Sequence, residues 1–536
     1  MGTLYRGGFV YSPADPFATA MLVRDGVVAW VGSDEAAGTH ADTGDQVVDL
    51  DGALVTPAFV DAHAHLSQTG LALRGLDVSR TSSLAEALDR VERAARAGRG
   101  RPLYVHSWEE SRWPERRPPT AAELDRAAYG GSVYMPRIDG HCAAASSALL
   151  AASGARGLDG WTDTGLVTRA AHHAVRAAFH AGVPPASRRE DIATALAAAA
   201  AAGIGLVHEH AGPLLSSRED LADVLAAGQG GQGPRTVGYW AELVSDPAEA
   251  TRLVGQTGAR GLAGDLVVDG SLGSRTASLR EPYADATGRG SAYLNVEQVR
   301  NHVVACTLAG VQAGFHVIGD AGVDTAVAGL RAAAWVVGAP AIRAARHRLE
   351  HVEMADADAI ATLAGLGVVA SVQPAFDAAW GGDAGMYAAR LGPRRAATMN
   401  PFAAMAAAGV LLALGSDTPV TPFAPWEAVR ACVRHHQEAQ RISARSAFLA
   451  HTRGGWRAAG VDDRGVLGPG QPATFAVWEV GDLVVQAPDD RVQTWSTDPR
   501  SGTPGLPDLS ADAPVPACLR TVVDGVIVHD LDGALG

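Results

Sequence analysis

The sequence predicts an α/β fold: a (β/α)₈ barrel of the TIM type with a small β-sandwich domain formed from both chain termini. Short apolar stretches alternate with Ala-rich helical stretches over roughly 400 residues, as in βα units of a barrel. Several apolar stretches end in His, Glu, Asp or Gln, and barrel enzymes carry their chemistry at the carboxyl ends of the strands. Both ends of the chain contain consecutive short strands instead, which indicates a second, all-β unit.

The terminal domain is predicted from strand patterns that flank tight turns. Asp25-Gly26 and Asp524-Gly525 lie between apolar stretches, and Asp-Gly in that setting favours a β-hairpin. We expect the sandwich domain in residues 1–57 and 463–536 and the barrel in residues 58–462. The expected strands of the sandwich are 7–12, 19–33, 46–57, 473–480, 483–488 and 519–530.

The barrel is predicted from seven apolar segments and the helical stretches between them. Residues 70–190 break the rhythm with pieces rich in Trp and Pro, so we expect an insertion there, over the mouth of the barrel. The expected barrel strands are 54–65, 203–210, 264–271, 311–320, 347–353, 367–374 and 410–417.

Composition excludes several classes of function. The 536 residues carry a net charge of -14, which argues against a nucleic acid or an anionic membrane as partner. No export signal and no membrane span are recognisable, and the four cysteines form no CxxC pair. We therefore expect a cytoplasmic protein that acts on a small molecule, and the sequence leaves a homo-oligomer open.

Histidine and aspartate at the strand ends predict a metal site. His63 and His65 are two residues apart, so in a strand both side chains project to the same face. His316, His351 and Asp417 each end a later expected strand. Gly314 and Gly415 each come two residues earlier on the same strand face and leave room beneath the side chains of His316 and Asp417. Four histidines and an aspartate in this order indicate ligands gathered at one end of the barrel.

Several longer stretches resemble the amidohydrolase superfamily, and within it the family 3 group that includes N-substituted formamide deformylases. The resemblance covers nearly the whole chain. It implies that His63, His65 and His316 are metal ligands and that Asp417 is both a ligand and the proton-transfer group. It also implies that His351 is either a ligand of a second metal or a hydrogen-bond donor to the reacting carbonyl. The matching stretches are 51–65, 267–285, 315–326, 346–353, 367–374, 411–420 and 465–477.

One departure from the family concerns the number of metals. Relatives often have a carboxylated lysine that bridges two ions, whereas this chain has Asp265 there and no lysine anywhere, so no carboxylated lysine can form. The first hypothesis is one metal held by His63, His65, His316 and Asp417. The second is a two-metal site bridged by Asp265, and the third is a degraded site. Ligands of nitrogen and oxygen suit Zn²⁺ first, then Mn²⁺ or Fe²⁺.

Other polar and aromatic residues are candidates for substrate binding. Arg275 could hold a substrate carboxylate, and His141 belongs to an Asp-Gly-His stretch that resembles a substrate-region motif. Trp380 is one of five aromatic residues that follow the last two expected strands. These rings either line the pocket and favour a hydrophobic substrate, or pack the loops themselves. The pairs His172-His173 and His435-His436 are interpreted as surface residues. The other four aromatic residues are Phe376, Tyr387, Phe423 and Trp426.

Three functions remain open at the level of the sequence. The first is hydrolysis of a non-peptide C–N bond, in a small and hydrophobic amide or N-substituted formamide, by metal-activated water. The second is deamination of a small heterocyclic amine at a mononuclear metal site. The third, from another class, is a catalytically inactive barrel that binds a small molecule.

Overall fold

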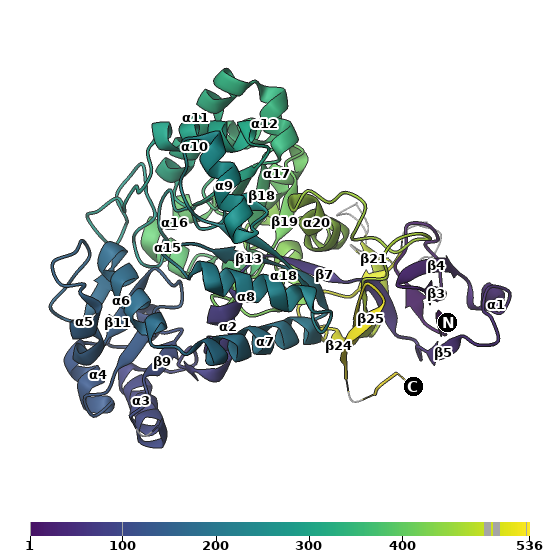
Figure 1. The fold of residues 1–536 in the computed structure, drawn as a ribbon, viewed down its shortest axis with the longest axis horizontal. Coiled ribbons are helices and arrows are strands. Elements are labelled where there is room, and N and C mark those ends of the chain that lie inside the picture. The colour runs from purple at the N-terminus through teal and green to yellow at the C-terminus, as the bar shows by residue number, and fades with distance from the viewer. Residues whose placement is uncertain (1, 99, 487–494, 497–503, 532, 536) are drawn as a thin grey trace.

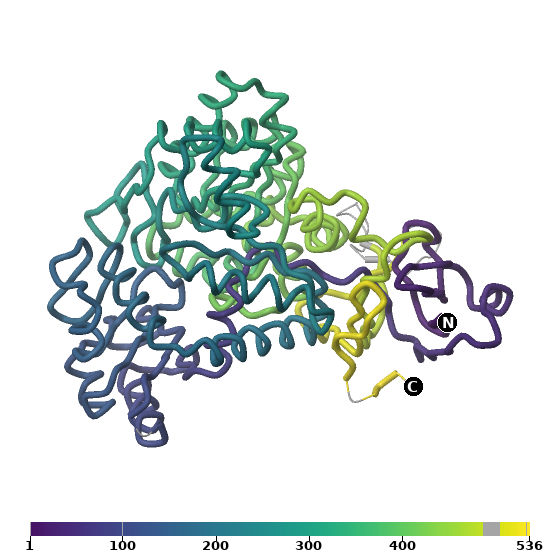
Figure 2. The backbone as a smooth tube through the Cα atoms, viewed as in Figure 1, coloured from purple at the N-terminus to yellow at the C-terminus, as the bar shows by residue number. Residues whose placement is uncertain are grey.

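The computed structural model describes residues 2–98, 100–486, 495–496, 504–531 and 533–535. The barrel lies in the middle of an elongated molecule (Figure 1). Strands from the chain termini lie at one end, and the segment between the first two barrel strands forms the opposite end (Figures 1 and 2). The predicted fold class is confirmed.

Eight strands form the barrel sheet, and every neighbouring pair is parallel. The first and last strands meet where Ala64 bridges Thr418 and the Asp417 N–H donates to the His63 carbonyl at 2.8 Å. The carboxyl ends of the strands therefore surround one opening. In sheet order the strands are β7 (Phe59–Ala64), β13 (Ile204–Ala211), β14 (Arg235–Trp240), β15 (Gly261–Leu262), β16 (Gln312–Val317), β17 (Arg348–His351), β18 (Val369–Val372) and β19 (Leu412–Leu414).

Two barrel strands differ from expectation. Residues 235–240 form β14, a strand that was not expected, because its first three residues are partly exposed and give no apolar run. The segment 264–271 is wrong as a strand. The strand is Gly261–Leu262, and the following residues are irregular apart from two isolated bridges, of Val267 with His316 and of Asp269 with Ala292. This irregular course brings Asp265 over the opening.

Helices surround the barrel, and their buried faces share its main apolar core. Local signals fix several starts: Asn295 and Gln298 form a capping box at α10, and Asp356 caps α13. The helices of this region are α2 (Leu66–Arg74), α7 (Pro185–Ala201), α8 (Arg218–Gln229), α9 (Pro247–Thr257), α10 (Val296–Leu308), α11 (Asp320–Val337), α12 (Ala339–Ala345), α13 (Ala357–Leu366), α14 (Pro374–Trp380), α15 (Met386–Leu391), α16 (Pro393–Ala396), α17 (Phe402–Ala407), α18 (Pro425–Val433), η2 (Glu438–Gln440), α19 (Ala444–Leu449), η3 (Ala450–Gly454) and α20 (Gly455–Ala458).

The chain termini share one sheet. β6 (Leu54–Pro57) pairs with β20 (Phe475–Glu479), and the order is β2-β6-β20-β24-β25. A second sheet, β4-β3-β1-β5, and a third, β22-β21-β23, accompany it. The domain boundaries stay a prediction, and residues 487–488 of one expected strand lie outside the described residues. The remaining elements are β1 (Gly2–Arg6), β2 (Phe9–Val10), β3 (Ala20–Arg24), β4 (Val27–Gly32), α1 (Asp34–Ala37), β5 (Gln46–Asp49), β21 (Leu483–Gln486), β22 (Trp495–Ser496), β23 (Leu506–Pro507), β24 (Ala517–Val523) and β25 (Val526–Asp530).

The segment between β7 and β13 carries its own sheet, in the order β12-β11-β10-β9-β8, and its own apolar cores. We call residues 76–181 the inserted region. Its elements are β8 (Leu76–Asp77), α3 (Leu84–Gly98), β9 (Leu103–His106), η1 (Glu110–Arg112), α4 (Ala121–Ala127), β10 (Val133–Pro136), β11 (Cys142–Ala145), α5 (Ser147–Ser153), β12 (Leu166–Thr168) and α6 (Arg169–Ala181).

Among the described residues, no single helix has the length and apolar composition needed to cross a membrane. α11 and α12 reach that length and composition only together, with a bend of 115° between them.

Candidate metal centre and substrate cavity

Five of the six predicted ligands come from strands and loops that end at the same opening, and the sixth, Asp265, reaches it from the irregular segment after β15. His63 lies in β7 and His65 directly follows it. His316 lies in β16 and His351 ends β17. Asp417 comes three residues after β19. The structure therefore brings together all the residues that the sequence predicted as ligands.

Each of three histidines uses one ring nitrogen to hold its orientation. The Nδ1 atoms of His63, His65 and His351 lie 3.0 Å from Glu350 Oε2, 2.8 Å from the His210 carbonyl and 2.7 Å from Gln373 Oε1. All three partners are oxygen acceptors, so Nδ1 is the donor and Nε2 of the neutral ring keeps its lone pair. An outer hydrogen bond of this kind orients metal-binding histidines in general.

The Nε2 atoms of His63 and His65 lie near two carboxylates, at distances that suit ligands of a metal ion. His63 Nε2 lies 3.4 Å from both Asp265 Oδ1 and Asp417 Oδ1. His65 Nε2 lies 3.2 Å from Asp265 Oδ2 and from Asp417 Oδ1. These contacts exceed the usual N–H···O distance of about 2.9 Å. They match the edge, about 3.4 Å, of a tetrahedron of ligands at about 2.1 Å from an ion.

Buried atoms without partners also fit a metal. Among the described residues, His63 Nε2, Asp265 Oδ1 and His351 Nε2 are buried and have no hydrogen bond. A buried polar atom without a partner is costly, so a cation between these atoms would remove the cost. Three groups of ligand atoms that could hold an ion occur in the described chain, and all three include His63.

The buried carboxylates of the centre favour a positive charge between the ligand residues. Burial lowers the pKa of His63, but the carboxylates of Asp417 and Asp265 outweigh it and raise this pKa to about 10. Burial likewise raises the pKa of Asp265, yet His63 and the other nearby histidines hold it well below its usual range. A divalent cation would satisfy the carboxylates while leaving the histidines neutral, as metal binding requires.

The backbone is strained at two of these residues. Asp417 has a φ of 55° and His351 a φ of 71°, both in the left-handed region that non-glycine residues rarely adopt. Such strain persists where surrounding contacts enforce it, and it occurs often at functional sites. Here it turns both side chains toward the opening of the barrel.

His210 is a neighbour of the centre that the sequence did not single out. Its ring stacks on that of His63 with centroids 3.8 Å apart, and neither ring nitrogen has a hydrogen bond among the described residues. Its alternation with His208 in β13 was the available signal. Glu209, between them, lies outside the ligand set. Its carboxylate accepts the Leu66 N–H at 2.7 Å and so fixes the chain just after His65.

The ligand cluster opens into a cavity of about 310 Å³, which we call the main cavity. Its wall includes His65, Asp265, His316 and Asp417 on one side and residues of the inserted region on the other. A second cavity of about 30 Å³, the small cavity, lies beside His351 and Asp417. The main cavity is of a size that small-molecule sites commonly have.

His141 connects the inserted region to the metal centre. It lines both cavities, and its ring centroid lies 5.1 Å from that of His316. Burial and the neighbouring His316 lower its pKa to about 3, so the ring is neutral at physiological pH. This position agrees with the predicted place of His141 in the substrate region.

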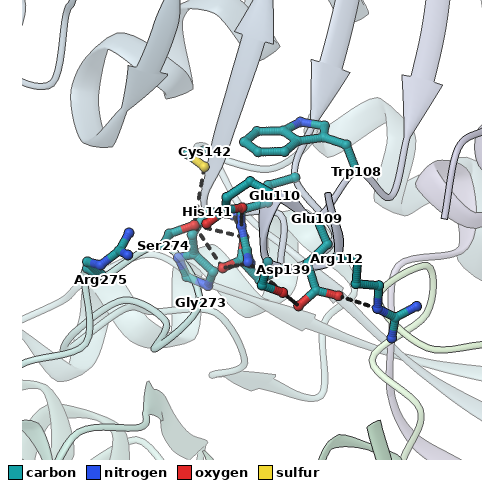
Figure 3. Close-up of polar contacts among 12 residues, drawn as sticks. Trp108, Glu109, Glu110, Arg112, Asp139, His141, Cys142, Gly273, Ser274 and Arg275 are labelled. Atoms are coloured by element: carbon teal, nitrogen blue, oxygen red, sulfur yellow. Dashed lines mark hydrogen bonds and ion pairs between the residues drawn. The ribbon is translucent and has the colours of Figure 1, made fainter. Parts of the chain in front are cut away.

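A polar network centred on Asp139 holds the segment that carries His141 (Figure 3). The Asp139 carboxylate accepts hydrogen bonds from Ser271 Oγ at 2.7 Å and Ser274 Oγ at 2.8 Å, both in the loop after β15. It also pairs with the buried Arg137 at 3.0 Å. The inserted region and the loop that follows Asp265 are therefore tied to each other.

Arg275 lies apart from this network in Figure 3, and it lines neither cavity. Its Nε and Nη2 atoms contact Asp285 at 3.1 and 2.7 Å. The guanidinium atoms that would bind a substrate carboxylate are thus already paired. Trp380 is buried and lines the small cavity, where the centroids of its ring and the Phe376 ring lie 4.9 Å apart.

Two sequence interpretations near the cavities are wrong. His172 and His435 are buried rather than on the surface: His172 contacts the Tyr134 hydroxyl, and the ring of His435 packs against that of Phe402. His172 lines the main cavity. Trp426 lines neither cavity and packs in the barrel core against Phe59 and Phe448.

Comparison with known proteins agrees with this geometry. The model of the amidohydrolase family, Amidohydro_3, matches residues 46–529. The chain belongs to the amidohydrolase family. Its members are hydrolases, and the grouped His, Asp and Glu side chains described above could bind a metal.

Individual relatives show how far the similarity extends. Protein LONG AFTER FAR-RED 3 of Arabidopsis thaliana is 28% identical over 500 residues, which cover 86% of this chain and 84% of that protein. An N-substituted formamide deformylase of Arthrobacter pascens is 33% identical over 136 residues, 25% of each chain. An uncharacterized metal-dependent hydrolase of Pyrococcus horikoshii OT3 has the same fold, with a TM-score of 0.71, 23% identity, and coverage of 90% of this chain and 98% of that one.

Proposed function

We propose that this amidohydrolase hydrolyses a non-peptide C–N bond of a small amide or N-substituted formamide. The observation that carries the proposal is the convergence of His63 Nε2, His65 Nε2, Asp265 and Asp417 on the barrel side of the main cavity. The formamide deformylase that matches a quarter of the chain supports the substrate class. The intact ligand set argues against an inactive barrel.

His63, His65 and Asp417, whose ligand atoms form one group, would hold one ion, for which Zn²⁺ fits the donor set best. His316, the fourth ligand of the one-metal hypothesis, belongs to none of the ligand groups of the described residues. His63 supports the count of one, because it belongs to every ligand group of the described chain and has a single nitrogen available. When bound, the ion supplies the Lewis acidity that activates water near neutral pH. His316 and His351 lie beside Asp265, and with it would form the second position of a two-metal site.

Asp417 would move the proton. Its carboxylate lines both cavities and lies 3.2 Å from His65 Nε2, next to the ligands and open to a substrate. Such a carboxylate accepts a proton from the attacking water and returns it to the nitrogen as the C–N bond breaks. His351 suits binding a cation better than donating to an oxyanion, because its Nδ1–H is used by Gln373 and its Nε2 keeps a lone pair.

Metal content and turnover of the purified chain test the proposal together. We expect about one equivalent of tightly bound metal per chain, and hydrolysis of at least one amide or formamide in a panel that also contains heterocyclic amines. Two equivalents of bound metal per chain would contradict the one-ion centre and favour a two-metal site bridged by Asp265. Deamination without amide hydrolysis would overturn the proposed reaction. Metal content below about a tenth of an equivalent after supplementation would favour an inactive, ligand-binding barrel.

A further inference from the structure

The inserted region places a buried cation without an acidic partner on the wall of the main cavity. Arg176, in α6, is 7% exposed and lines this cavity. Its Nη2 donates to the Gly140 carbonyl at 2.8 Å, and its Nη1 approaches the Leu214 carbonyl at 3.4 Å. In the described part of the chain, no carboxylate lies within 4.0 Å of its nitrogens. A buried charge without a counter-charge is costly, which indicates a partner that arrives with the ligand.

A second polar group beside Arg176 is also available to a ligand. Arg176 Nη2 lies 3.4 Å from His172 Nδ1, and His172 Nε2 lies 2.8 Å from the Tyr134 hydroxyl. A guanidinium only donates, so His172 Nδ1 accepts and His172 Nε2–H donates to the Tyr134 oxygen. The Tyr134 hydroxyl hydrogen then has no acceptor in this chain of contacts, and Tyr134 lines the main cavity. Arg176 and Tyr134 thus offer two donors to one anion.

The position of Arg176 relates this donor pair to the reaction centre. Its hydrogen bond goes to Gly140, and the next residue, His141, lies with its ring 5.1 Å from that of His316. The same cavity is also lined by apolar and aromatic side chains, among them Tyr104, Leu215 and Val420. A ligand that spans it therefore has a reacting group at one end, an apolar middle and an anion at the other end.

We propose that the substrate carries a carboxylate, which binds Arg176 and Tyr134 while the scissile amide lies at the metal centre. This proposal rests on the proposed function and specifies its substrate as an N-acyl or N-formyl compound with an apolar body and a carboxylate. One unpaired guanidinium matches one negative charge and the planar shape of a carboxylate. The other arginine of α6, Arg169, is already paired with Asp159 at 2.8 Å, so the site lacks the second cation that a phosphate dianion would need.

A pair of substrates that differ only in the carboxylate tests the proposal on the wild-type protein. N-formylphenylalanine and N-formylphenethylamine form such a pair, and a phosphonate in place of the carboxylate distinguishes the two kinds of anion. We expect kcat/KM to be about 10- to 100-fold higher for the carboxylate than for the neutral compound, mainly through KM. Equal rates, or a preference for the neutral compound, would overturn the proposal, and a preference for the phosphonate would replace the carboxylate.

Variants separate recognition from a structural role of Arg176. Arg176→Met should lower the ratio of kcat/KM between the carboxylate and the neutral compound toward one, whereas Arg176→Lys should retain part of the preference. Arg169→Met, on the same helix, should keep the preference. If Arg176→Met lowers the rate on both substrates equally, Arg176 is structural and the proposal fails.

Binding of 3-phenylpropionate, measured by calorimetry at matched metal content, gives a readout that does not need turnover. Weaker binding by about tenfold or more in Arg176→Met is expected. Unchanged binding contradicts the carboxylate site. If no amide is hydrolysed but this difference is present, the proposed reaction fails and the anion site stands.

Discussion

The two sides of the main cavity differ in charge and in origin. The barrel side gathers two carboxylates and several histidines at strand ends, and its pKa shifts indicate a missing positive charge. The side from the inserted region has the unpaired Arg176 beside neutral imidazoles, and burial followed by the charge of Arg176 lowers the pKa of His173 to about 4. The barrel therefore needs a cation and the inserted region needs an anion. The difference suggests that the barrel supplies the reaction and the inserted region the recognition of the substrate.

The largest expected effect comes from Asp417→Asn on the barrel side. Loss of the proton-accepting carboxylate should lower kcat by about 10³-fold, the range for a general acid–base group. Thermal unfolding of the metal-loaded variant should change little, because the Asp417 backbone N–H still donates to the His63 carbonyl. Single-turnover kinetics of the metal-loaded variant measure the effect. Full activity in this variant would remove Asp417 from the mechanism.

Removing the cation, which binds on the barrel side, should lower the free energy of unfolding. A metal present at roughly 1,000 times its Kd adds about 4 kcal/mol to the free energy of unfolding, so chelation should lower the denaturant midpoint by a matching amount. Asp265→Asn should weaken metal binding by at least about 10- to 100-fold, since even outer contacts of a metal site have effects of this size.

Asp269→Asn is the matched control for Asp265→Asn. Asp269 accepts N–H groups of Ser278, Ile318 and Gly319 at 2.7–2.8 Å, so this variant should lose stability but keep its metal. Competition with a chromogenic chelator measures both affinities. Equal metal affinity of Asp265→Asn and the wild type would place Asp265 outside the ligand set.

Asp139→Ala should uncouple the two sides. It leaves Arg137 buried with one fewer counter-charge and removes the contacts to Ser271 and Ser274, at a cost of about 3–5 kcal/mol in unfolding free energy. KM should rise while metal content stays the same. Hydrogen exchange in residues 76–181 and in the loop 270–275 would follow the change. A loss of metal without a rise in KM would contradict the division between the two sides.

The smallest expected effect concerns His302, a buried histidine of α10, and the stability of the protein in acid. Val244 N–H donates to His302 Nδ1 at 3.1 Å, and the other ring nitrogen lies 2.9 Å from the Leu262 carbonyl. Burial lowers the pKa of His302 to about 4 from 6.5, so the unfolded chain binds the proton first as pH falls. The stabilisation is complete above pH 6.5 and declines toward pH 4, by about 2–3 kcal/mol.

His302→Gln should flatten this part of the stability curve, which urea unfolding at a series of pH values would show. Metal-free protein serves as the second sample, because it separates the wall histidine from those at the centre. An unchanged slope between pH 6.5 and 4 in the variant would assign the acid sensitivity to other groups.

Local patterns were sufficient for the ligands on the barrel strands. His63 and His65 follow from the two-residue period of a strand, and Asp417 and His316 from their places at strand ends. Local patterns did not predict burial where it depends on packing against residues far away in sequence. His172 and Arg176 lie in an Arg-rich helix with the composition of a surface helix, and only its packing over the barrel mouth buries them. For Trp426 the sequence left open whether the ring lines the pocket or packs internally, and the structure encloses it in the barrel core.

The sequence by itself determined the barrel, the candidate ligand residues and the absence of a lysine bridge, because periodicity and residue chemistry are local properties. Only the tertiary structure decided that the short Asp265 side chain reaches the histidines, since the chain leaves the regular strand after Leu262. It also decided that Arg275 is paired with Asp285 and that Arg176 is unpaired beside the cavity. Whether a charge is neutralised depends on neighbours brought together by folding, and residues distant in sequence supply those neighbours.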